Sequence, residues 1–127
     1  MKRILIAEDE LFVALDLEYV VERVGYQTSG PVTSVKEADG SISAELPACA
    51  ILDVRLIDGE IFPVADRLRE AGVPILFHSG HADEGELLHR YPVARVCPKP
   101  STLAALQDAL TALLPTCSDT PAIVTPG

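Results

Sequence analysis

The sequence lacks three features that would each have assigned it to a broad class of protein. It has 10 basic residues against 19 acidic ones, a net charge of -9 and no run of lysine or arginine. Nucleic acids and anionic lipids bind clustered positive charge, so neither is an expected partner. The first apolar run, Ile4 to Ala7, is too short for a signal peptide or a membrane span, which indicates a cytoplasmic protein.

Paired cysteines are also missing. The three cysteines Cys49, Cys97 and Cys117 are widely spaced and form no C-x-x-C motif, which argues against a zinc ribbon or a dithiol redox site. Cys49 and Cys97 fall within apolar runs, and we expect both to be buried free thiols.

What the sequence does contain is an alternation of short apolar runs and helical periods. Four runs are continuous rather than alternating, which is typical of strands buried on both faces: residues 4–7, 48–52, 73–77 and 93–97. Apolar side chains at helical spacing predict helices between and after them: residues 13–24, 61–68 and 103–113. Weaker signals predict a second strand within residues 26–32, a helix within 34–46 and a short polar helix over 83–90.

This alternation predicts one α/β domain, with a doubly wound sheet of five parallel strands in the order 2-1-3-4-5. The domain is expected to cover residues 1–115. Residues 116–127 contain prolines and few apolar side chains, which predicts a disordered tail.

Polar residues follow or end four of the predicted strands. In open parallel sheets, ligands bind beyond the carboxyl ends of the strands, near the point where the strand order reverses. The residues expected to meet there are Glu8, Asp9, Asp53, Ser79, Gly80 and Lys99.

Three carboxylates in one place raise one another's pKa unless a cation compensates them. Oxygen ligands suit Mg²⁺, which commonly binds one or two protein carboxylates, waters and a phosphate oxygen. The pattern therefore predicts Mg²⁺-dependent phosphoryl transfer to Asp53, with Ser79 and the Gly80 amide as donors and Lys99 as a cationic clamp.

With these motifs the chain resembles the receiver domains of bacterial two-component response regulators. The motifs are ILIAEDE, AILDVRL, FHSGHAD and CPKP, in that order, and the resemblance extends from Lys2 to Leu114. It implies phosphorylation of Asp53 by a sensor histidine kinase or a histidine phosphotransfer protein. It further implies that the Arg55 carbonyl joins the metal ligands and that the Lys99–Pro100 bond is cis.

The chain departs from the receiver pattern at four places. Val96 stands where receivers often carry an aromatic switch residue, and Ile57 replaces a common proline. The Asp58-Gly59 loop is about two residues shorter than usual, and Ser101 replaces an aromatic. We expect phosphorylation to survive these changes, and the signal to leave through the short helix after Ser79 or through another surface.

Other functions fit the residues less well. His78, His81 and His89 with Asp83, Glu84 and Glu86 could form a transition-metal cluster, but their predicted positions differ. A flavodoxin would need a phosphate-binding loop where the acids stand, and a haloacid-dehalogenase-type phosphatase would need Asp-x-Asp after the first strand.

The expected function is therefore a stand-alone response regulator in a phosphorelay. It would not be an enzyme, although it would assist its own phosphoryl transfer and dephosphorylation. It would bind an unknown protein target when phosphorylated, or serve as a relay or phosphate sink. The alternative is a pseudo-receiver, an interaction module that never accepts phosphate.

Overall fold

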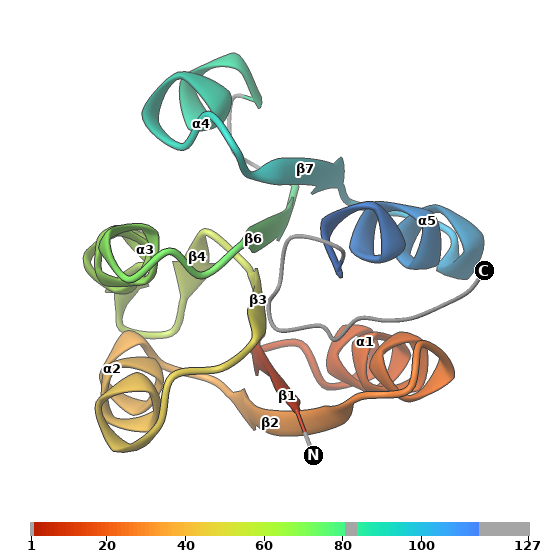
Figure 1. Cartoon of the computed structure of the whole chain (residues 1–127), viewed down its shortest axis with the longest axis horizontal. Coiled ribbons are helices and arrows are strands. Elements are labelled where there is room, and N and C mark those ends of the chain that lie inside the picture. Colours follow the sequence, from red (N-terminus) through yellow and green to blue (C-terminus); the bar gives the residue numbers. More distant parts are fainter. Residues whose placement is uncertain (1, 81–83, 115–127) are drawn as a thin grey trace, which may run out of the picture.

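The computed structural model describes residues 2–80 and 84–114. In this part of the chain a parallel sheet of five strands has the order β2-β1-β3-β6-β7, which confirms the predicted α/β class and strand order. Helices α1 and α5 cover one face of the sheet, and α2, α3 and α4 lie on the other (Figure 1). Among the described residues, no helix combines the length and the apolar character that a membrane crossing requires.

The described strands are β1 (Arg3–Ala7), β2 (Gln27–Val32), β3 (Cys49–Leu52), β4 (Arg55–Leu56), β5 (Gly59–Glu60), β6 (Ile75–Ser79) and β7 (Arg95–Pro98). The described helices are α1 (Leu11–Arg23), α2 (Val35–Ala44), α3 (Phe62–Glu70), α4 (Glu84–Arg90) and α5 (Leu103–Leu113).

Alternation along the buried strands divides the core into two layers. In β1, Ile4 and Ile6 pack with α1 and α5, whereas Leu5 and Ala7 pack with α2 and α3. Successive side chains of a strand point to opposite faces, so a sheet covered on both sides needs apolar residues at every position. This explains why the buried strands appear in the sequence as unbroken apolar runs.

The predicted helices and buried thiols are confirmed, with small shifts. Thr102 caps α5, because its hydroxyl accepts a hydrogen bond from the Ala105 amide at 3.0 Å. Cys49 and Cys97 are buried free thiols. Cys117 and the predicted disordered tail lie outside the described residues.

The last strand begins later than predicted. We expected it to start at Val93, but β7 starts at Arg95, and the Val93 side chain is 79% exposed. The Ala94 amide donates to the Tyr91 carbonyl at 3.0 Å, so a turn occupies the residues before β7. An apolar run in the sequence does not reveal such a turn, because the sequence alone does not show that the apolar side chain of Val93 lies at the surface instead of in a buried strand.

A short hairpin, β4–β5, was not predicted. It follows Asp53, and Asp58 in its turn accepts hydrogen bonds from the first amides of α2, at 2.6 Å from Val35 and 3.2 Å from Lys36. The Val35 hydrogen bond holds the Asp58 pKa below its usual value. The loop after the strand-end acid is thereby attached to the start of α2, which Ser34 also caps.

A polar cluster joins α3 to the end of α4. The buried Tyr91 hydroxyl donates to Asp66 Oδ1 at 2.6 Å, and Arg90 donates to Asp66 Oδ2 at 3.0 Å. The hydrogen bond from Tyr91, then that from Arg90, lowers the pKa of Asp66, while burial and Asp66 raise the pKa of Tyr91. The Tyr91 ring also packs against Phe77 of β6, with 5.1 Å between ring centroids.

We expect Tyr91→Phe to lower the free energy of unfolding by about 1 to 2 kcal/mol at neutral pH, because a hydrogen bond to a charged group is lost. A lowered Asp66 pKa stabilises the fold above the unfolded-state pKa of about 3.9, and this contribution disappears as pH falls through the folded-state value. The difference in the free energy of unfolding between the wild type and Tyr91→Phe should therefore decrease as the pH falls. Urea denaturation at several pH values measures it.

The matched control is Asp39→Asn, which removes an exposed ion pair with Arg67. Exposed pairs contribute less than about 1 kcal/mol, so this variant should stay close to the wild type. A Tyr91→Phe protein as stable as the wild type at neutral pH would contradict a stabilising role for the cluster.

Candidate functional site

The predicted site residues come from the carboxyl ends of neighbouring strands. Glu8 directly follows β1 and Asp53 directly follows β3, and the Asp53 amide donates to the Ala7 carbonyl at 2.9 Å. The two strands are parallel and in register, with Ala7 opposite Leu52. The backbone ladder between β1 and β3 thus brings the two acids to the same edge of the sheet.

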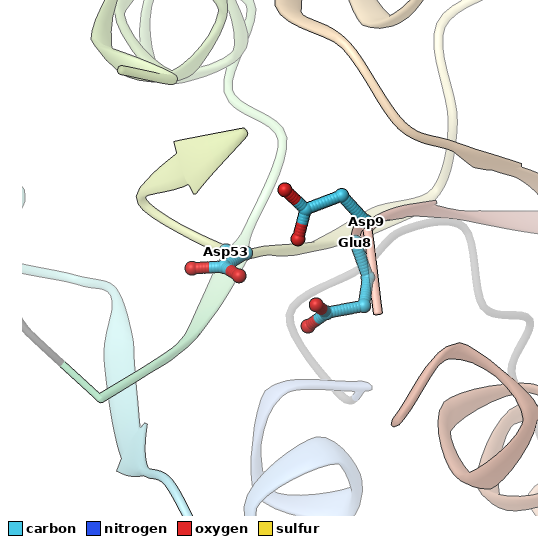
Figure 2. A group of neighbouring side chains, drawn as sticks. All are labelled: Glu8, Asp9 and Asp53. Atoms are coloured by element: carbon cyan, nitrogen blue, oxygen red, sulfur yellow. The ribbon is translucent and has the colours of Figure 1, made fainter. Parts of the chain in front are cut away.

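The carboxylates of Glu8, Asp9 and Asp53 converge at this edge (Figure 2). Each residue offers an oxygen, and these three oxygens all lie within 4.8 Å of one another. Glu8 and Asp53 are buried, with 1% and 6% of their surfaces exposed, and Asp9 is half-buried. The predicted crowding of three acids is therefore present.

Lys99 supplies the compensating positive charge. Its ammonium donates to Asp53 Oδ2 at 2.9 Å and to Glu8 Oε2 at 3.1 Å. A weaker contact reaches the exposed Glu10 carboxylate at 3.4 Å. Burial lowers the pKa of Lys99, but the hydrogen bonds to Asp53 and Glu8 outweigh burial and raise it, so the ammonium stays charged. The Lys99–Pro100 peptide bond is cis, as the resemblance implies.

The buried Glu8 carboxylate is only partly compensated. Burial raises the pKa of Glu8 to about 7, although hydrogen bonds from Lys99 and from the Glu10 amide act in the opposite direction. Lys99 Nζ lies 3.0 Å from Oε1 but makes its hydrogen bond to Oε2, and Oε1 accepts no hydrogen bond from the described residues. The carboxylate can therefore accept a second cation beside Lys99.

The donor set fits Mg²⁺. The cluster offers carboxylate oxygens, one of them buried and without a hydrogen bond, and it opens into a pocket of about 720 Å³. Mg²⁺ keeps several waters and binds few protein carboxylates, which requires such an open oxygen site. Receiver domains typically use Mg²⁺ at an acidic pocket of this kind.

The other predicted residues lie around the same edge. Gly80 lines the pocket with Asp53 and Lys99, and a Cβ added to Gly80 would meet the Lys99 Cβ at an ordinary 3.5 Å. Ser79 is the buried last residue of β6, and its carbonyl accepts a hydrogen bond from the Lys99 amide at 3.1 Å. The Arg55 amide donates to Asp53 Oδ1 at 3.3 Å, a contact not predicted from sequence.

The sequence prediction also missed His78 as a residue of this pocket. His78 is 3% exposed and lines the pocket with Asp53 and Lys99. The transition-metal cluster considered above receives no support in the described residues, where the acids at 8, 9 and 53 are the one group able to hold a metal. His81 and Asp83 lie outside the described residues. Alternation along β6 could have indicated His78, since it follows Leu76 on the α1–α5 face.

Solved structures with the same fold support the receiver architecture. A response regulator receiver protein from Sinorhizobium medicae superimposes with a TM-score of 0.81 at 27% identity, covering 92% of this chain and 97% of that one. SdrG from Sphingomonas melonis has a TM-score of 0.75 at 34% identity, covering 90% and 97% of the two chains. The molecule thus has the α/β receiver fold.

A curated relative extends the comparison to sequence. The phyllosphere-induced regulator PhyR of Methylorubrum extorquens is 34% identical over 83 residues, which is 63% of this chain. The match spans 31% of PhyR, so most of that relative lies outside it. No protein-family model matches the chain. From the structural matches, the chain belongs to the response-regulator receiver domains.

Proposed function

We propose that this receiver domain accepts a phosphoryl group on Asp53 and thereby switches its affinity for a protein partner. The donor is a phosphohistidine on a sensor histidine kinase or on a histidine phosphotransfer protein. The single observation that carries the proposal is the arrangement of three carboxylates and one lysine at the carboxyl edge of the sheet.

In the proposed reaction, an Asp53 carboxylate oxygen attacks phosphorus. The bond between phosphorus and the donor imidazole nitrogen breaks, and its electron pair remains on that nitrogen. Glu8, Asp9, Asp53 and the Arg55 carbonyl would hold Mg²⁺, which when bound neutralises charge on the phosphoryl oxygens. The Arg55 amide supports the geometry of Asp53 by donating to Oδ1.

Lys99 has two tasks in this proposal. In the structure its ammonium is bound to Asp53 and Glu8, where it reduces the repulsion between the two buried acids. We propose that the same ammonium binds a phosphoryl oxygen once Asp53 is modified, because a phosphoryl group is a stronger anionic partner than a carboxylate. Ser79 and the Gly80 amide are proposed as the remaining donors.

The proposal is tested by thermal denaturation with Mg²⁺ and then with Mg²⁺ plus beryllofluoride, a phosphoryl mimic. A ligand that binds only the folded state at tenfold its Kd stabilises it by about 1.4 kcal/mol, which raises the melting temperature by roughly 3 to 6 °C. Mg²⁺ should therefore raise the midpoint, and beryllofluoride should raise it further. NaCl at matched ionic strength controls for screening.

Asp9→Ala should have a higher metal-free midpoint than the wild type and respond little to Mg²⁺, because it removes both repulsion and a ligand. Glu10→Gln is the matched control, since Glu10 is exposed and lies outside the group of three carboxylates. If the wild type and Asp9→Ala respond equally, the acids form no metal site. A wild type that binds Mg²⁺ without responding to beryllofluoride would favour the pseudo-receiver alternative.

A further inference from the structure

His78 lies on the same face of the sheet as the acids of the site. Leu76, two residues earlier in β6, packs with α1 and α5, and alternation assigns His78 to that face. Strands β3 and β6 pair in parallel with Leu52 opposite Phe77, so the next step along both strands brings Asp53 beside His78. Both residues line the pocket of about 720 Å³.

The imidazole of His78 is buried without hydrogen bonds. The residue is 3% exposed, and neither ring nitrogen has a hydrogen-bond partner among the described residues. A buried polar group without a partner destabilises the fold, so an apolar side chain would suit this position better if it only filled the core. A ligand entering the pocket could supply the missing partner.

The surroundings indicate what kind of ligand that is. The charged groups that act on the ring are Lys99, Asp53, Asp16 and Glu10. Three of these four are acids, which only accept hydrogen bonds when ionised, so Lys99 is the one cationic donor in this set. A phosphoryl group on Asp53 brings further acceptor oxygens into the pocket that the His78 ring lines, and each of them can accept more than one hydrogen bond. Imidazole carries at least one N–H in either protonation state, so this argument does not depend on its charge.

We infer that His78 donates a hydrogen bond to the phosphoryl group carried by Asp53 and so adds to its binding. This inference rests on the proposed function. His78 is a neighbour of Asp53 within the sheet, so a phosphoryl group on Asp53 would lie in the pocket that the His78 ring lines. Water that hydrolyses the aspartyl phosphate must enter in line, opposite the Asp53 oxygen. In that step water forms the new P–O bond, the bond between phosphorus and the Asp53 oxygen breaks, and Asp53 leaves as a carboxylate. The protons of the water leave with the inorganic phosphate, so His78 takes no proton.

The test measures the affinity for beryllofluoride in the presence of Mg²⁺, by fluorine NMR titration. His78→Leu should bind about tenfold more weakly or worse, as expected for losing a hydrogen bond to a charged group. His78→Gln keeps an N–H donor and should stay within about threefold of the wild type. His89→Leu, an exposed histidine of α4 that lies outside the pocket, is the matched control and should bind like the wild type.

Thermal denaturation separates this role from a structural one. Without ligand, His78→Leu should be at least as stable as the wild type, because it removes an unpaired polar group. If it does not fold, His78→Ala takes its place in the titration. Equal beryllofluoride affinities for the wild type and the Leu or Ala variant would overturn the role of His78 alone. A wild type that binds no beryllofluoride would overturn the proposed function and this inference together.

Discussion

Asp53→Asn is expected to accept no phosphoryl group from a small acyl phosphate in the presence of Mg²⁺, whereas the wild type should gain the mass of one. The side-chain amide of asparagine is a poor nucleophile, because it lacks the negative charge of the carboxylate that attacks phosphorus. The fold should persist, because Lys99 keeps its contacts with Glu8 and one buried carboxylate is removed from the crowded edge. Intact-mass spectrometry measures the outcome.

Asp16→Asn is the matched control for this experiment. Asp16 also lines the pocket, but it lies on α1 and outside the group of three carboxylates. The Asp16→Asn protein should therefore still accept the phosphoryl group. A phosphorylated Asp53→Asn protein would show that the acceptor is another residue.

Lys99→Met is expected to lower the free energy of unfolding of the metal-free protein by about 2 to 4 kcal/mol. Removing one partner of a buried ion pair leaves the other charge uncompensated, at a cost of about 3 to 5 kcal/mol, and the partial exposure of Lys99 reduces this figure. The side chains of Glu8 and Asp53 are 0% and 8% exposed, and that of Lys99 is 17% exposed. Methionine keeps most of the side-chain volume, so the change is mainly one of charge.

Mg²⁺ should restore part of this loss, since it supplies positive charge to the same carboxylates. Chemical denaturation with and without Mg²⁺ measures both effects. Lys36→Met, at an exposed lysine of α2, is the control and should change stability by less than about 0.5 kcal/mol. If Lys99→Met were as stable as Lys36→Met, the ion pairs of Lys99 would not contribute to stability.

The strand order and the meeting of the acids could be predicted because both depend on strong local signals. Continuous apolar runs such as Ile4 to Ala7 mark strands covered on both faces, and each run points to the residue that follows it at the sheet edge. Parallel strands place those residues together whatever the details of the loops. The position of Asp53 relative to Glu8 follows from this rule alone.

The features that were missed depend on contacts with no periodic signal. Strands β4 and β5 have two residues each, which is too short for alternation to be recognised. Tyr91 and Asp66 are 25 residues apart, and nothing in the sequence near either residue indicates that they meet. Lys99 was predicted to lie beside the acids as a clamp for the phosphoryl group, and in the structure its ammonium donates directly to the carboxylates of Asp53 and Glu8.

The contacts of Lys99 also constrain the order in which the site can form. Its partners Glu8 and Asp53 lie 91 and 46 residues earlier in the chain. Contacts across such separations form late, because closing long loops is entropically costly before other contacts offset it. During synthesis, a nascent chain that has not yet reached β7 holds the acidic residues without their lysine. The acceptor pocket is therefore completed only when β7 joins the sheet. A partly synthesised domain without β7 lacks a complete acceptor site.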